Sequence, residues 1–193
     1  MNHYTSNLPP LLLASQSPRR QQLLGQAGLA YRVKAAHLDE DFPADLPVEE
    51  VAAYIALQKA KAVLADIRPL EVIVAADTTV CLDQEILGKP YDEYDAAWML
   101  RSLSGKRHEV ITGVCLMNVA QTKIFSVCTQ VYFKPLTHDQ INYYVETHQP
   151  YDKAGGYAIQ EWIGLVGIEK IEGCYFNVVG LPVSRLLSEL ALF

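Results

Sequence analysis

Two continuous apolar runs constrain the fold of this chain more than any other feature. Leu11–Ala14 and Glu71–Ala76 each consist almost wholly of apolar residues, without the alternation of a half-exposed strand. Such runs are typical of strands that are covered on both faces of a sheet. Helical patterns are interspersed with the predicted strands, but not in strict βαβ alternation. The sequence therefore predicts a mixed α/β fold, a mixed sheet with helices on its faces.

Periodicity and turn residues give approximate bounds for the other elements. Helices are expected over 18–27, 47–65, 92–103 and 137–147, and from Pro182 to the C-terminus. Strands are expected over 31–36, 80–82, 109–117, 125–133, 165–171 and 175–179, the third and fourth of these as neighbours.

Composition limits the classes of function. The chain has 193 residues, half of them hydrophobic, with a net charge of −6. This suits one domain over 1–193 with a loose tail at 1–10, and argues against nucleic acid or anionic membranes as partners. No run has the length of a membrane helix, and the four cysteines are too far apart for a disulfide framework or a zinc site. We expect a cytoplasmic protein.

The start of the first predicted helix carries two adjacent arginines. Ser17 suits an N-cap, and Pro18 suits the first helical turn. Arg19 and Arg20 then lie at the positive end of the helix dipole, where each cation costs roughly 0.3–1 kcal/mol. An anion bound by the backbone N–H groups and the guanidinium groups would relieve this cost. The pattern leaves two interpretations open, an anion site or two solvated surface arginines.

Lys59 falls in the middle of the apolar face of the helix predicted over 47–65. That face is formed by Val48, Val51, Ala52, Ile55, Ala62 and Val63. The ammonium group either extends past the apolar side chains to water or reaches over the edge of the core into a charged cleft. The sequence does not choose between these.

Asp77 is the carboxylate most expected to take part in chemistry. It ends the apolar run Glu71–Ala76, and strand ends are where α/β proteins usually place catalytic groups. A charged group there needs a metal, a cation or hydrogen bonds, although an aspartate that caps a turn is the alternative. The acidic run Asp39–Asp41 is a weaker candidate, because such runs are usually solvated.

The common nucleotide-binding motifs are absent from the sequence. No G-x-G-x-x-G follows a strand, and Gly88–Pro90 lacks the remaining residues of a P-loop. What remains is a few carboxylates and the dispersed cations Arg19, Arg20, Lys59, Lys89 and Lys153. This combination suits a phosphorylated substrate carried with a divalent metal, because Mg²⁺ takes only one or two protein carboxylates beside phosphate oxygens and water.

From about Leu11 to the final helix, the chain resembles the Maf family of nucleoside triphosphate pyrophosphatases. The matching segments, in order, are 15–20 (SQSPRR), 39–40 (DE), 59–60 (KA), 75–78 (AADT), 88–90 (GKP), 112–113 (TG) and 152–160 (DKAGGYAIQ). The resemblance implies an elongated mixed sheet with two lobes around a cleft, similar to inosine triphosphate pyrophosphatases. It also implies a homodimer.

The resemblance further implies a reaction and a set of site residues. A nucleoside triphosphate is hydrolysed to the monophosphate and pyrophosphate with a divalent metal, Mg²⁺ or Mn²⁺. Asp77 matches the proton acceptor, and Asp77 with Glu40 would hold the metal. The residues expected to bind substrate are Arg19, Arg20, Glu40, Lys59 and Lys89.

Three positions bear on the choice of nucleotide. Family members that resemble this chain at Arg19, Thr78 and Gln160 act on dTTP and UTP, in a housecleaning role. An amide such as that of Gln160 donates and accepts together, which matches the imide edge of uracil or thymine. The alternatives are the branch that prefers 7-methyl-GTP, and a nucleotide-binding regulator of septum formation without turnover.

Overall fold

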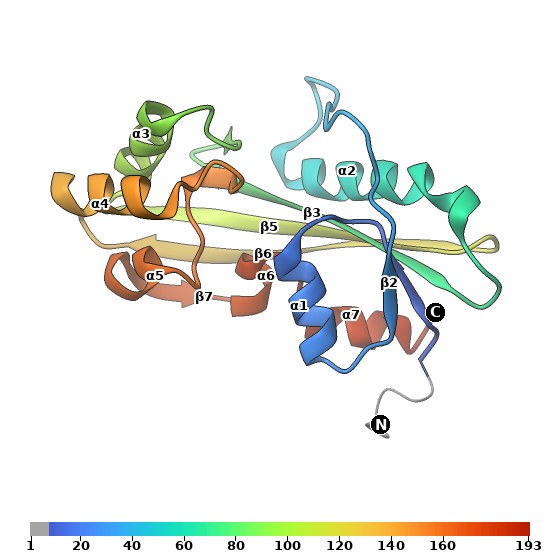
Figure 1. Ribbon diagram of the computed structural model, residues 1–193. Coiled ribbons are helices and arrows are strands. Elements are labelled where there is room, and N and C mark those ends of the chain that lie inside the picture. The colour runs from blue at the N-terminus through green and yellow to red at the C-terminus, as the bar shows by residue number, and fades with distance from the viewer. Residues whose placement is uncertain (1–7) are drawn as a thin grey trace. The chain divides into compact units, whose positions relative to one another are not determined.

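A computed structural model describes residues 8–193 (Figure 1). In this part of the chain seven strands form one sheet. Their order is β2 (Tyr31–Val33), β1 (Leu11–Leu13), β3 (Val72–Leu82), β5 (Arg107–Met117), β6 (Thr122–Phe133) and β7 (Ile168–Glu172), with β4 (Glu85–Leu87) paired to β3. Parallel and antiparallel pairs both occur, so the predicted mixed sheet with flanking helices is confirmed. Of the tail expected at 1–10, residues 1–7 lie outside the described residues. The carbonyl of Pro10 already accepts a hydrogen bond from Val72 N–H at 3.0 Å.

The chain divides into two compact units. The first contains the residues up to Asp77, Thr112–Val127 and Gly180–Phe193, and the second contains Thr78–Ile111 and Cys128–Val179. The three long strands contribute residues to both units: β3 (Val72–Leu82), β5 (Arg107–Met117) and β6 (Thr122–Phe133). None of the helices in the described chain is long and apolar enough to cross a membrane.

The first unit is built around short parallel strands. Its other elements are β1 (Leu11–Leu13), α1 (Pro18–Gln26), β2 (Tyr31–Val33), α2 (Val48–Ala62), the 3₁₀ turn η1 (Leu64–Asp66) and α7 (Val183–Leu190). β1 pairs in parallel with β2 on one side and with β3 on the other. α2 covers one face of these strands, and α1 and α7 lie on the other face (Figure 1).

A glycine lets α2 lie directly on the sheet. Gly113 is in β5, and a Cβ atom added there would lie 2.2 Å from the backbone nitrogen of Ala53 in α2. Small residues fill the rest of this interface, where Ala56 and Ala60 pack against Leu12 and Ile73. Close packing of this kind fixes the height of α2, and with it the position of Lys59 on that helix.

The second unit packs its helices around one apolar core. Its elements are β4 (Glu85–Leu87), α3 (Glu93–Leu103), α4 (His138–His148), the 3₁₀ turn η2 (Ala154–Gly156), α5 (Trp162–Gly167), β7 (Ile168–Glu172) and α6 (Tyr175–Val179). α4 begins at a capping box, with Thr137 Oγ1 accepting from Gln140 N–H and Gln140 Oε1 accepting from Thr137 N–H. The core includes Leu100, Leu103, Ile141, Tyr144 and Ile163, all nearly or fully buried.

One strand prediction in this unit is wrong, and the strand expected over 165–171 is correct only from Ile168 onward. Residues 162–167 form α5 before β7 begins at Ile168, and Tyr175–Val179 is a short helix instead of a strand. The helical turn of α6 is held by buried Asn177, whose amide donates to Val110 O at 2.9 Å and to Thr129 Oγ1 at 3.0 Å. These tertiary contacts override the β propensity of Tyr, Phe and Val, which is strongly context-dependent.

Candidate active site

A buried lysine joins two carboxylates in the first unit. Nζ of Lys59 lies 2.6 Å from Asp77 Oδ1 and 2.6 Å from Glu40 Oε1. Asp77 comes from β3, and Glu40 comes from the loop that precedes α2. Of the two interpretations that the sequence left open, the ammonium group therefore reaches charged groups and not water. Because two carboxylates face one ammonium, the cluster keeps a net negative charge when all three groups are ionised.

Asp77 lies inside a strand, so the prediction that it ends one is wrong. β3 runs without interruption from Val72 to Leu82, and Asp77 is 8% exposed. The residues that follow Asp77 are mostly β-branched and apolar and continue the strand readily. A buried carboxylate is tolerated in the middle of the sheet because Lys59 compensates its charge. Successive side chains of a strand point to opposite faces, so Thr78 does not share the face of Asp77.

The start of α1 is built around Arg20. This side chain is 8% exposed, and its Nε donates to Gly180 O at 2.8 Å while Nη1 donates to Ser15 Oγ at 3.2 Å. Ser17 is the N-cap residue but its side chain makes no capping bond; its N–H donates to Ser15 Oγ at 3.2 Å. Arg20 is thus not a solvated surface arginine, whereas Arg19 is half-buried.

The charges of this region act on one another. Burial lowers the pKa of the Arg20 guanidinium, while the carboxylates of Asp77 and Glu40 raise it and the charge of Arg19 lowers it. The guanidinium of Arg20 therefore interacts electrostatically with both carboxylates that contact Lys59. The first unit offers carboxylate oxygens that can take a cation or a proton, and guanidinium and ammonium groups that can take an anion.

The donor set at Lys59 fits a hard divalent cation that is shared with a substrate. No group of three His, Cys, Asp or Glu side chains within residues 8–193 could enclose a metal ion. Asp77 and Glu40 nevertheless present oxygen ligands to one point, now taken by the Lys59 ammonium group. Two carboxylates are what Mg²⁺ or Mn²⁺ needs from a protein when phosphate oxygens and water complete its coordination.

Two segments that the sequence analysis treated separately are joined in the second unit. The N–H of Gly155 donates to the carbonyl of Gly88 at 2.9 Å, which places Lys89 beside the 152–160 loop. Gly155 has a φ of +68°, and a Cβ atom there would lie 2.9 Å from Val80 Cγ1. Glycine is therefore required on two grounds, backbone conformation and space. Lys89 itself is exposed.

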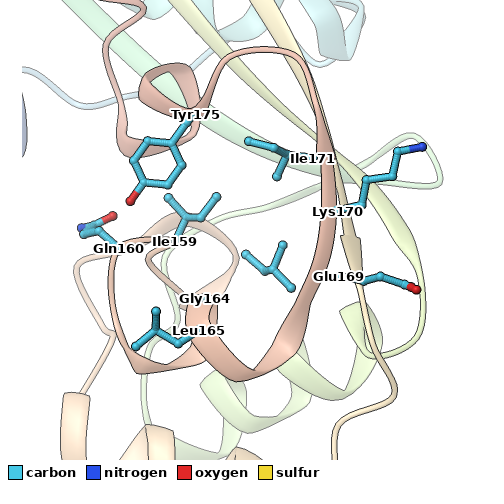
Figure 2. Close-up of a pocket in the computed structure, with 9 residues that line it drawn as sticks. Ile159, Gln160, Gly164, Leu165, Glu169, Lys170, Ile171 and Tyr175 are labelled. Atoms are coloured by element: carbon cyan, nitrogen blue, oxygen red, sulfur yellow. The ribbon is translucent and has the colours of Figure 1, made fainter.

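Gln160 lies at a pocket of about 360 Å³ in the second unit. Figure 2 shows the Gln160 amide and the Tyr175 hydroxyl on the same side of this pocket, with Ile159, Leu165 and Ile171 supplying apolar surface. An apolar pocket with a few polar groups at its rim is typical of small-molecule sites. The structure thus brings Glu40, Lys59, Asp77 and the arginines together in one unit and places Thr78, Lys89 and Gln160 in the other.

Sequence reasoning missed the residues that surround Gln160. Tyr144 and Glu161 contact the turn that carries it, and Tyr175 lines the same pocket. Tyr144 has the helical spacing of a core residue, so its hydroxyl gave no signal in the pattern. Tyr175 lies in a segment that was expected to be a strand. From the sequence, Lys153 is singled out only as one of several dispersed cations, and the rest of 152–160 only as a match to the family.

Comparisons with known proteins find relatives that match nearly the whole chain. A dTTP/UTP pyrophosphatase from Phocaeicola vulgatus is 50% identical over 181 residues, which is 93% of this chain and 94% of the relative. A dTTP/UTP pyrophosphatase from Cytophaga hutchinsonii is 48% identical over 180 residues, 93% of this chain and 82% of the relative.

A solved structure and a family profile complete the comparison. The structure of the Staphylococcus aureus Ham1 protein covers 94% of this chain and 98% of its own, with a TM-score of 0.50 and 15% identity, which speaks for the fold alone. The profile of the family described as Maf-like protein matches residues 10–193. With that match over nearly the whole chain and relatives at about half identity, this protein belongs to the Maf family.

Proposed function

We propose that this chain is a nucleoside triphosphate pyrophosphatase that hydrolyses dTTP and UTP to the monophosphate and pyrophosphate. The observation that carries the proposal is the cluster of buried Lys59 and Asp77 with exposed Glu40, beside the arginines of α1. It is supported by the names of relatives that are 50% and 48% identical over 94% and 82% of their own length.

The proposed chemistry begins at Asp77. Its carboxylate accepts a proton from a water molecule, whose oxygen attacks the α-phosphorus of the nucleotide. The bond from the α-phosphorus to the bridging oxygen breaks, and pyrophosphate leaves with that oxygen. Before ligands bind, Lys59 holds Asp77 in position, and Arg19 and Arg20 supply positive charge at the start of α1 for the phosphate oxygens.

Asp77 and Glu40 are the residues that would hold a divalent cation, Mg²⁺ or Mn²⁺. Such a cation neutralises charge that develops on phosphate oxygens. Within the protein, the Lys59 ammonium group would then have to leave the point at which the two carboxylates converge. Lys59 is long enough to turn toward a phosphate group while its methylene stem stays packed in α2.

The nucleotide preference is assigned to Arg19, Thr78 and Gln160, and Lys89 is a further phosphate ligand. We also propose that the protein acts in the cytoplasm, where nucleoside triphosphates are used, and that it is a homodimer. Light scattering on the purified chain measures the oligomeric state directly.

The direct test is pyrophosphate release from a panel of dTTP, UTP, CTP, GTP and 7-methyl-GTP, each with Mg²⁺, with Mn²⁺ and with a chelator. We expect release from dTTP and UTP that requires a metal. Release mainly from 7-methyl-GTP would assign the protein to that branch. Binding without release from any nucleotide would replace the enzyme by a nucleotide-binding regulator.

Asp77→Asn tests the proposed general base. The amide keeps the shape of the side chain but cannot accept the proton, so we expect kcat to fall by about 10²–10⁴ while nucleotide binding is retained. Asp83→Asn is the matched control, because Asp83 is exposed in the turn that follows the same strand. A rate for Asp77→Asn near that of the control would remove Asp77 from the mechanism.

A further inference from the structure

The turn that carries Gln160 is tightly fixed at the backbone. The N–H of Glu161 donates to Ala158 O at 3.0 Å, and the N–H of Gly164 donates to Glu161 O at 3.0 Å. A Cβ atom at Gly164 would lie 1.8 Å from Ile159 O, so α5 packs directly on the turn. Gln160 is exposed, and its amide makes no hydrogen bond with another residue of the described chain.

One buried hydroxyl bonds to both ends of this turn. Tyr144 lies on α4 and is fully buried. Its hydroxyl oxygen accepts a hydrogen bond from Ala158 N–H at 3.1 Å, and its O–H donates to the carboxylate Oε2 of Glu161. Burial, followed by the bond to Glu161, raises the pKa of Tyr144, so the phenol keeps the proton that it donates.

Two further basic side chains lie close to the carboxylate of Glu161. Nζ of Lys153 lies 3.5 Å from Glu161 Oε1 and 2.7 Å from Asp152 Oδ1. Nδ1 of His148 lies 3.7 Å from Glu161 Oε2, and its ring stacks on Tyr144 with centroids 4.8 Å apart. Every one of these groups belongs to the second unit. This network of contacts fixes the backbone of the turn that carries Gln160, and the Gln160 amide can bind a ligand.

We propose that Tyr144 and Glu161 are positioning residues for base selection, which hold the Ala158–Glu161 turn so that the Gln160 amide stays at the pocket of Figure 2. The inference rests on the proposed function, in which Gln160 recognises uracil or thymine. An amide that must donate and accept at defined atoms binds well only when its backbone is already in place, because ordering it on binding costs affinity. In this role Tyr144 and Glu161 act through the backbone of the turn and not by contact with the base or the phosphates.

The test uses Tyr144→Phe, which removes only the hydroxyl oxygen. The matched control is Tyr143→Phe, because Tyr143 is the exposed neighbour on the same helix and contacts Trp162 through its ring. For Tyr144→Phe we expect the KM for dTTP and UTP to rise about tenfold, the effect of one or two lost hydrogen bonds, with kcat nearly unchanged. The preference for dTTP over CTP in kcat/KM falls by a similar factor, and Tyr143→Phe keeps it.

Glu161→Gln is a second variant that keeps the size of the side chain and removes its charge. We expect the same loss of preference, again in KM. An unchanged dTTP preference in both variants overturns the inference. It is equally overturned if kcat falls alike on dTTP and CTP together with the melting temperature, because that is the signature of a structural role alone.

Gln160→Ala, measured in parallel, separates this inference from the proposal on which it rests. If Gln160→Ala loses the preference and Tyr144→Phe keeps it, Gln160 recognises the base without help from the network. If wild-type protein hydrolyses neither dTTP nor UTP, or if Gln160→Ala leaves the preference unchanged, the base-reading role fails and the inference fails with it.

Discussion

Each of the two units buries a lysine between two carboxylates. Lys59 in the first unit and Lys153 in the second are both 8% exposed. Lys59 is held by Asp77 and Glu40, whereas Lys153 is held by Asp152 and Glu161. The two arrangements contain the same kinds of charged groups. They differ in how far the carboxylates lie from the lysine in the sequence.

The difference lies in where the partners come from. Asp77 and Glu40 belong to a strand and to a loop that are far from Lys59 in sequence, so Lys59 gathers separate elements at one point. Asp152 and Glu161 lie in the same segment as Lys153, so that lysine orders a single loop. A buried lysine can thus assemble a reactive site or stiffen one segment, and the origin of its partners indicates which.

The largest effect is expected from Lys59→Met, which keeps the length of the side chain and removes the charge. We expect kcat/KM for dTTP to fall by about 10²-fold or more, because both substrate charge and the position of Asp77 lose support. In the variant, Mg²⁺ should raise the melting temperature more than in the wild type, since the Lys59 ammonium group no longer occupies the point at which Asp77 and Glu40 converge.

Lys61→Met is the control for that variant, because Lys61 is exposed on the same helix. Equal activities of the two methionine variants would show that Lys59 has a packing role only, and the contrast between the two lysines would disappear.

Acid should affect the two units in different ranges of pH. Burial lowers the pKa of His108 in the second unit to about 4, against 6.5 for an exposed imidazole. The unfolded chain therefore takes up a proton below about pH 6.5 that the folded chain refuses until about pH 4. Stability falls as pH decreases through this window, by about 3 kcal/mol in full and by between about 1 and 2 kcal/mol at about pH 5.5.

In the first unit, the bond from Arg32 lowers the pKa of Glu71, at distances of 2.7 Å and 2.6 Å to its two oxygens. The stability that Glu71 contributes is present above its unfolded pKa and is lost only at lower pH, as pH falls through the depressed value.

Urea unfolding at several pH values, for the wild type and His108→Gln, measures the loss of stability that is expected from His108. If the variant loses as much stability as the wild type between about pH 7.5 and about pH 5.5, His108 is not the source.

The smallest effect is expected from Lys153→Met. Because this lysine orders only the 152–160 loop, we expect the KM for dTTP to rise by about tenfold or less, with kcat almost unchanged. Steady-state kinetics beside Lys59→Met decide the comparison. A loss in kcat as large as that of Lys59→Met would mean that Lys153 also acts on the phosphates, and that the origin of its partners is a poor guide.

Sequence patterns single out two members of the cluster in the first unit, because both residues break the local pattern. Lys59 interrupts an apolar helical face, and Asp77 follows a run of apolar residues, so both positions demanded a partner. Glu40 gave no comparable signal within an acidic loop, and only the resemblance to the family singled it out. The burial of Arg20 was not predictable, since its partners are the carbonyl of Gly180 and the hydroxyl of Ser15.

The second unit was harder to predict for a related reason. Its helical segment at 175–179 depends on Asn177 reaching β5 and β6, which no local pattern reveals. The role of the Tyr144 hydroxyl could not be predicted from the sequence either, because the apolar ring alone explains a tyrosine at the spacing of a core residue. A residue that breaks the local hydrophobic pattern can be recognised as a candidate site residue from the sequence. A residue that fits the pattern can be recognised only from its long-range contacts in the structure.

Gly113 shows that sensitivity to mutation and chemical participation are separate properties. It has no group that could bind or react, yet a single methyl at this position would collide with the backbone of Ala52 and Ala53, which has little freedom to move. The displaced helix would carry Lys59 away from Asp77. A saturation mutagenesis screen for activity would therefore rank Gly113 with the reactive residues. Sensitivity in such a screen would not show that Gly113 takes part in the chemistry, because its role is to leave space for α2.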